Sequence, residues 1–329
     1  SSHGTSCLSL MAGNIPDKYV GTAPLASYFL CRTEDVSSEN MIEEYNWVSA
    51  AEFLDSIGID IISTSLGYVD FDLPQWDHVY SDLDGETSVI TIGSEIACSK
   101  GILCVTSAGN EGGTSFPYIS VPSDGKNVLT VGAVDKYGNQ AFFSSVGPTF
   151  DGRIKPDVMA HGYNVMVAVT WGTGYAEGSG TSFSCPVLAG MAACLWQANK
   201  QLPANSIRDL LRQNANYSDN PNNNYGYGIP DFKDAFEDMI IGENPNFVIN
   251  SLISVFPNPS DGNVNVNIET IGEVCVEVYD HIGKLLYSNI VTRYYISELN
   301  TFLDGLSSGV YLIKVNDDEN NQTVKLVKY

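Results

Sequence analysis

A glycine-rich turn runs directly into a predicted helix in the stretch Gly178-Ser179-Gly180-Thr181-Ser182-Phe183-Ser184-Cys185-Pro186. The following residues, 187–196 (VLAGMAACLW), are apolar almost throughout, as in a helix that crosses the middle of a large domain. Proline is tolerated in a first helical turn, where its missing N–H costs nothing. We therefore expect Ser182 at the N-terminus of a buried helix, where unpaired N–H groups and the helix dipole stabilise a developing oxyanion.

Two interpretations of Ser182 follow from this position. A serine at a helix start commonly acts only as a cap. A serine nucleophile instead needs an imidazole that accepts its proton and a donor for the tetrahedral oxygen. His3, in His3-Gly4-Thr5, and Asn110, in Ser107-Ala108-Gly109-Asn110-Glu111-Gly112, are of these chemical types, and they favour the nucleophile.

Several short motifs occur in a fixed order along residues 1–241. They are His3-Gly4-Thr5, Ala12-Gly13, Ser65-Leu66-Gly67, Ala108-Gly109-Asn110, Lys155-Pro156-Asp157-Val158 and Gly180-Thr181-Ser182. Together they resemble the successive signatures of the subtilisin-like serine proteases. The resemblance implies that Ser182 is the nucleophile, that His3 is the general base, and that Asn110 donates to the oxyanion beside the backbone N–H of Ser182.

The predicted elements alternate between helix and strand. Helices are expected at residues 38–57 and 87–100, and strands at 25–31, 59–65 and 102–106. This alternation predicts an α/β fold with a parallel sheet flanked by helices, and the resemblance makes it subtilisin-like, with the N-terminal strands missing. Since sites of such sheets lie at the carboxyl ends of strands, Asn110 is expected there.

Substrate-binding residues are implied by the resemblance. The Ser65-Leu66-Gly67 edge would bind an extended peptide as an added strand, although a plain strand end remains the alternative. Ala108 and Gly109 would leave room for a substrate side chain. Gly109 and Gly180 together suggest an open, apolar cleft that accepts many kinds of substrate side chain.

The triad carboxylate is not found in this chain. In the resembling proteases the acid precedes the histidine, and no residue here replaces it. We expect the chain as given to be a fragment or processed form and nearly inactive. An inactive pseudoprotease or a cell-surface peptide-binding module therefore stays open, whereas an esterase is disfavoured because Gly-Thr-Ser-Phe-Ser is not a G-x-S-x-G elbow.

Metal and cysteine chemistry is weakly indicated. No cofactor is predicted. Structural calcium is left open for the acidic residues 68–86, where a solvated loop is the favoured interpretation. A disulfide between Cys98 and Cys104 is likewise left open. His161 replaces a proline usual in the resembling proteases, and we interpret it as a surface substitution.

The net charge of −23, from 39 acidic and 16 basic residues, disfavours nucleic acid and anionic membranes as partners. No apolar run of about 18 residues indicates a transmembrane segment. This composition suits a soluble exported protein.

A second domain is expected at residues 251–329, after a polar linker at 242–250. Short alternating strands predict a small all-β sandwich. Phe256-Pro257-Asn258-Pro259, Val278-Tyr279-Asp280 and the Leu306-to-Tyr311 segment resemble the C-terminal sorting domain of type IX secretion cargo; a generic adhesion sandwich is the alternative. The resemblance implies secretion machinery as a partner and a Bacteroidetes-type cell. We expect a secreted serine endopeptidase that acts on polypeptide substrates.

Overall fold

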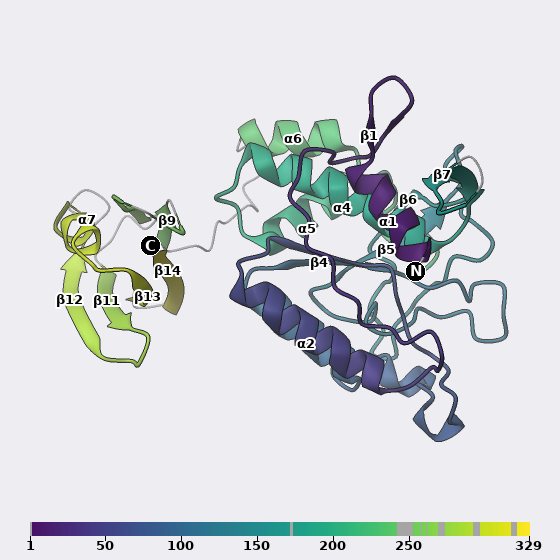
Figure 1. Cartoon of the computed structure of the whole chain (residues 1–329), viewed down its shortest axis with the longest axis horizontal. Coiled ribbons are helices and arrows are strands. Elements are labelled where there is room, and N and C mark those ends of the chain that lie inside the picture. Colours follow the sequence, from purple (N-terminus) through teal and green to yellow (C-terminus); the bar gives the residue numbers. More distant parts are fainter. Residues whose placement is uncertain are drawn as a thin grey trace. The chain divides into compact units, whose positions relative to one another are not determined.

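The computed structural model describes residues 2–171, 174–241, 253–256, 258–260, 262–268, 274–291, 297–316 and 321–329. The chain divides into two compact units, Ser1–Asn244 and Pro245–Tyr329 (Figure 1). The predicted linker at 242–250 lies outside the described residues.

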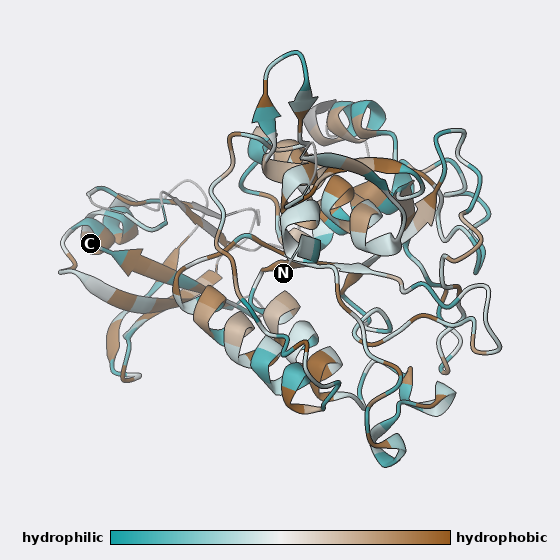
Figure 2. Ribbon diagram, turned by 45° about the vertical axis from the view of Figure 1, so that its right-hand side comes forward, coloured by the Kyte–Doolittle hydropathy of each residue, from teal (hydrophilic) through white to brown (hydrophobic). Residues whose placement is uncertain are grey.

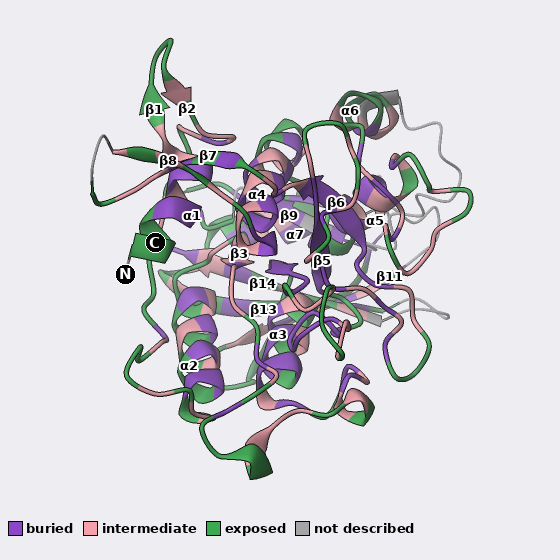
Figure 3. Ribbon diagram, turned by 90° about the vertical axis from the view of Figure 1, so that its right-hand side faces the viewer, coloured by how far each residue is buried: buried purple, intermediate pink, exposed green. Residues whose placement is uncertain are grey.

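A four-stranded parallel sheet forms the centre of the first unit. In spatial order its strands are β3 (Ile61–Thr64), β4 (Leu103–Ser107), β5 (Leu129–Val134) and β6 (Val158–His161). Every residue of β4 and β5 is buried, which explains why these strands do not alternate between apolar and charged residues; β5 is purple in Figure 3. The predicted parallel sheet is thus confirmed.

Helices cover the sheet on opposite sides, with α2 (Ile42–Ser56) and α4 (Thr181–Ala198) lying either side of β4 in Figure 1. Helix α4 contacts all four strands and also α1 (Ser2–Ala12). Gly190 allows a close approach here, because a Cβ at this position would lie 2.0 Å from Thr22 Oγ1. The predicted buried helix after Ser182 is confirmed.

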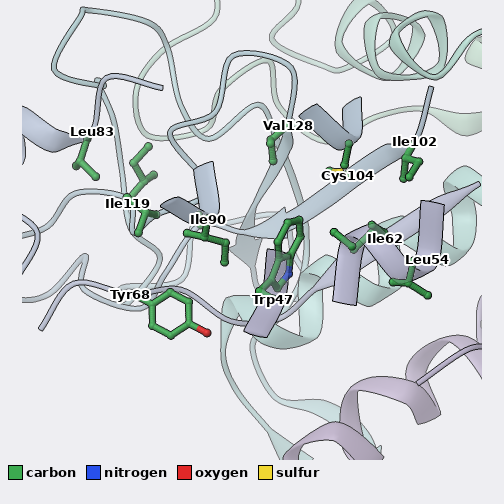
Figure 4. Packing of buried hydrophobic residues seen from close by; sticks show 14 of the residues in the cluster. Trp47, Leu54, Ile62, Tyr68, Leu83, Ile90, Ile102, Cys104, Ile119 and Val128 are labelled. Carbon is green, nitrogen blue, oxygen red and sulfur yellow. The ribbon is translucent and has the colours of Figure 1, made fainter. Parts of the chain in front are cut away.

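The core on the α2 side joins α2, the sheet and the helix α3 (Val89–Ser99). Figure 4 shows Trp47 and Leu54 of α2 beside Ile62 of β3, Cys104 of β4 and Ile90 of α3. Brown and teal segments alternate along α2 in Figure 2, and the apolar residues that this helix buries are Trp47, Ala51 and Leu54.

Shorter elements complete the first unit. They are the hairpins β1 (Asn14–Ile15) with β2 (Tyr19–Val20) and β7 (Val165–Ala168) with β8 (Tyr175–Gly178), the 3₁₀ turns η1 (Pro74–Trp76) and η2 (Tyr80–Asp82), and the helices α5 (Ala204–Gln213) and α6 (Phe232–Ile241).

The strand expected at residues 25–31 is wrong. These residues are in no helix or strand, and Leu25 and Leu30 are 90% and 73% exposed. A strand exists only when its backbone groups pair with a neighbour, and none of the described strands pairs with this segment. Its apolar composition alone therefore did not decide its conformation.

The second unit contains two antiparallel sheets and one helix. The elements are β9 (Ile253–Phe256), β10 (Asn265–Ile268), β11 (Val274–Asp280), β12 (Leu285–Val291), α7 (Ser297–Asp304), β13 (Gly309–Asn316) and β14 (Asn321–Lys328). Strands β9 and β10 pair with each other, and the larger sheet has the order β12-β11-β13-β14.

One core holds the second unit together. Alternate residues of β11 and β13, such as Val276 and Ile313, are fully buried against residues of β9 and β10, as a small all-β domain requires. The helix α7 was not predicted; its Leu299 and Leu303 are fully buried in the same core. The expected all-β region is confirmed, with this helix added.

Candidate active site

Ser182 lies in the first turn of α4, which begins at Thr181 after the N-cap Gly180. Its Oγ donates a long hydrogen bond of 3.4 Å to the carbonyl oxygen of Ser65, and Ser65 Oγ donates to the Ser182 carbonyl at 2.8 Å. The hydroxyl is half-buried. The end of β3 and the start of α4 are thus joined at the candidate nucleophile.

Asn110 is brought to the same helix start by the end of β4. Its Oδ1 accepts hydrogen bonds from Thr181 N at 2.9 Å and from Thr181 Oγ1 at 3.2 Å. Thr181 Oγ1 also donates to the Gly109 carbonyl oxygen and accepts from Gly109 N, both at 3.1 Å. The amide group Nδ2 of Asn110 has no partner among the described residues, so both of its hydrogens remain available.

His3 lies near the start of α1, which packs on α4. Its Nε2 is 3.7 Å from Cys7 Sγ, and Cys7 Sγ donates to the Ser182 carbonyl at 3.3 Å. The rings of His3 and Phe183 are 6.2 Å apart. The structure thus places His3 and Ser182 around one thiol, although within the described residues their hydrogen bonds are with Cys7 and Ser65 and not with each other.

Partial burial of the imidazole lowers the pKa of His3, although the residue as a whole is exposed. A lowered pKa favours the neutral imidazole, which is the form that can accept a proton. No described carboxylate forms a hydrogen bond or ion pair with His3.

The remaining predicted substrate residues flank Ser182 on two sides. Ser65, Leu66 and Gly67 follow β3, and Ala108 and Gly109 follow β4. Ala108 and Gly109 are buried, whereas Gly67 is exposed. The order of β3 next to β4 in the sheet is what brings these two segments side by side.

Cys7 was missed from the sequence. It lies one helical turn after His3, so the spacing of four residues was the available indication. Burial raises the pKa of the Cys7 thiol to about 11. Cys7 therefore acts as a neutral packing group between the two candidate catalytic residues.

His161 takes no part in this site. Its Nε2 lies 3.0 Å from the carbonyl oxygen of Tyr163, two residues further along the chain. Cys98 and Cys104 are both free thiols, so the disulfide left open for them is not formed in this structure.

The carboxylates of the acidic segment 68–86 mostly accept hydrogen bonds from backbone N–H groups of nearby turns. Asp77 accepts from Phe71 N, and Asp84 accepts from the backbone of Glu86 and Thr87. Among the described residues, only Glu34, Glu39 and Glu43 bring three carboxylate oxygens within 4.8 Å of one another. Structural calcium, which the sequence left open for residues 68–86, stays untested, and the one carboxylate cluster of the described residues lies outside that segment.

The first unit matches the model of the subtilase family over residues 1–228, and the chain belongs to this family. It is 31% identical over 255 residues to serine protease AprX of Bacillus subtilis (strain 168), which covers 69% of this chain and 55% of that protein. It is also 31% identical over 232 residues to subtilisin NAT of Bacillus subtilis subsp. natto, covering 70% and 54%. The chain thus spans about half the length of these curated relatives.

Solved structures show the same fold. The patellamide maturation protease PatA superposes with a TM-score of 0.60 at 25% identity, covering 74% of this chain and 85% of that one. MycP1 without its N-terminal propeptide gives a TM-score of 0.56 at 23% identity, covering 72% and 79%.

The second unit matches the secretion system C-terminal sorting domain over residues 254–329. A chain with this domain is secreted or attached to the cell surface, as expected from its motifs. In the described part of the chain, no helix has the length and apolar character needed to span a membrane.

Proposed function

We propose that this protein is a secreted serine endopeptidase in which Ser182 is the nucleophile, His3 the proton carrier and Asn110 an oxyanion donor. The observation that carries the proposal is the hydrogen bond from Thr181 N to Asn110 Oδ1. This bond fixes the carboxamide beside the helix turn that holds Ser182 and leaves its Nδ2 hydrogens free for a substrate oxygen.

The reaction begins when Ser182 Oγ attacks the scissile carbonyl and His3 accepts the hydroxyl proton. The resulting oxyanion is held by Asn110 Nδ2 and the N–H of Ser182, helped by the positive end of the α4 dipole. His3 then donates the proton to the leaving amine. Water then attacks the acyl-enzyme while His3 accepts a proton from it. His3 returns this proton to Ser182 Oγ as the acid product leaves.

Orientation of His3 in this proposal needs a carboxylate outside the described residues. The imidazole must turn its Nε2 from Cys7 toward Ser182 Oγ, and a carboxylate on the other ring nitrogen would hold that tautomer.

Fluorophosphonate labelling tests the proposal. The full protein should be labelled on Ser182, and Ser182→Ala should abolish labelling. Ser99→Ala is the matched control, because Ser99 is an exposed serine on α3. Labelling that survives Ser182→Ala would overturn the assignment of the nucleophile.

A peptide-binding module without catalysis is the second candidate. It is favoured by the lack of a described carboxylate partner for His3. Such a module would bind peptides but would leave Ser182 unlabelled.

A further inference from the structure

Two of the seven cysteines lie on either side of one tight turn. Cys98 is in the last turn of α3, and Cys104 is the second residue of β4. Gly101, whose φ is +93°, reverses the chain between them. Gly101 N donates to the Cys98 carbonyl at 3.0 Å, and Ile102 N donates to the Ala97 carbonyl at 3.2 Å. The strand therefore runs back past the last turn of the helix.

The sulfur atom of Cys104 lies against the helix face that carries Cys98. Cys104 Sγ donates to the carbonyl oxygen of Ser94 at 3.7 Å. In an α-helix the carbonyl of one residue accepts from the N–H four residues later, so the Ser94 carbonyl points toward Cys98. Cys98 also packs against the core cluster in which Figure 4 shows Cys104. The two side chains thus meet between α3 and β4.

The two thiols differ in access and in acidity. A hydrogen bond from the Cys104 thiol favours the thiolate of Cys98 and lowers the pKa of Cys98, although burial opposes it. The same interaction, together with burial, raises the pKa of Cys104. Cys98 is half-buried, whereas Cys104 is 1% exposed. Cys98 is therefore the thiol that a reagent from solvent meets first.

The compartment of the protein decides whether such a pair stays reduced. Disulfides form and persist outside the reducing cytosol. The sorting domain matched at residues 254–329 marks this chain as secreted or attached to the cell surface. Two thiols held together in such a protein are exposed to oxidants that a cytosolic protein does not meet.

We propose that Cys98 and Cys104 form a disulfide in the exported protein and thereby tie the end of α3 to β4. The oxidant is an external disulfide. The Cys98 thiolate attacks one sulfur of that disulfide and releases the other as a thiol. Cys104 then loses its proton, attacks Cys98 Sγ in the mixed disulfide and releases the second external thiol. Two protein thiols are oxidised, and one external disulfide is reduced to two thiols.

The crosslink stabilises the strand that leads to Asn110. β4 ends at Ser107, shortly before Asn110. A disulfide acts mainly by restricting the unfolded chain, and a short loop gives a smaller effect than a long one. Oxidation should therefore raise the melting temperature by about 5 °C. This inference does not depend on the role of Ser182.

Peptide mapping of the full protein tests the crosslink directly. The protein is purified with reductant, incubated with oxidised glutathione, treated with iodoacetamide to block free thiols, and then unfolded and digested with trypsin. Trypsin cleaves after Lys100, which lies between the two cysteines, and yields peptides 33–100 and 101–126, each with a single cysteine. Mass spectrometry should find these two peptides joined, lighter by two hydrogen atoms than their sum.

Two serine variants show which thiols are responsible. Cys98→Ser should abolish both the joined peptides and the gain in melting temperature on oxidation. Cys31→Ser is the matched control, because Cys31 is exposed, and it should keep both.

Three results would overturn the inference. They are recovery of the two peptides unjoined after oxidation, a bond from Cys98 to a cysteine other than Cys104, and a gain in melting temperature that Cys98→Ser retains. Fluorophosphonate labelling of Ser182 reports on the proposed function alone, whereas the joined peptides report on the cysteine pair alone. The failure of one is therefore distinguishable from the failure of the other.

Discussion

The backbone N–H of Thr181 donates a hydrogen bond of 2.9 Å to Oδ1 of Asn110. This bond joins the end of β4 to the start of α4 and satisfies one of the N–H groups that a helix start leaves unpaired. It also leaves Nδ2 as the atom of the carboxamide that is free to donate among the described residues.

Replacing Asn110 should therefore separate structure from catalysis. Asn110→Asp keeps an oxygen for Thr181 but removes the Nδ2 donor, so we expect a folded protein whose kcat falls by about 100-fold or more, the scale known for subtilisin. KM should change little. Steady-state kinetics together with the melting temperature check this; an unchanged kcat in Asn110→Asp would exclude Asn110 as an oxyanion donor.

Cys7 should resist alkylation. An ordinary exposed thiol has a pKa near ~8.5, whereas burial raises the pKa of Cys7 to about 11. At neutral pH its thiolate fraction is then lower by about 100-fold or more. Mass spectrometry after timed iodoacetamide treatment should show Cys31, which is exposed, modified long before Cys7. Equal rates for the two cysteines would contradict the buried position of Cys7.

His78 should make the first unit less stable as the pH rises. Burial by itself lowers the pKa of His78, but the hydrogen bond and charge of Glu44, 2.6 Å away, with the charge of Asp82, raise it overall. Stabilisation from a raised pKa is complete below the unfolded value of about 6.5 and is lost as the pH rises through the folded value. The melting temperature should fall over that range.

The pH dependence should be tested with His78→Leu, which leaves the buried Glu44 without its partner and should destabilise by about 3 kcal/mol. His161→Leu is the control, because the one side-chain hydrogen bond of His161 among the described residues is with the carbonyl oxygen of Tyr163. If His78→Leu retains the full fall in melting temperature above pH 6.5, the Glu44–His78 pair is not its source.

The charge of Asp157 should determine how stable the first unit is at acid pH. It is fully buried and bonded to Lys155 Nζ at 2.8 Å and to Arg212. Burial would raise the pKa of Asp157, but Arg212 and Lys155 outweigh it and lower that pKa to about 2. The stabilisation is therefore present above the unfolded pKa of about 3.9 and is lost as the pH falls toward 2.

Asp157→Asn should cost about 3–5 kcal/mol, because the buried Lys155 and the half-buried Arg212 lose their counter-charge. Urea unfolding at pH 7 measures this cost. A cost below about 1 kcal/mol would show that Lys155 and Arg212 do not depend on Asp157.

Local patterns were sufficient to predict much of the fold, whereas the candidate site residues came from the resemblance that the ordered motifs carry. Helix α2 followed from its apolar spacing, and the turn at Gly180 from its glycines. The position of Ser120 between Gly67 and Gly109 was not predictable, because Ser120 reaches them only through sheet order and hydrogen bonds between distant segments. The strand predicted at residues 25–31 was wrong, because the residue types favour a strand but no described strand pairs with this segment.

The bond between Thr181 and Asn110 couples maturation of the proposed enzyme to completion of its fold. Residues 110 and 181 are separated by 71 positions, so a chain emerging unfolded carries its serine without an aligned donor. Activity would then appear only after both halves of the domain have docked. The proposed activity therefore depends on a contact that exists only in the folded domain.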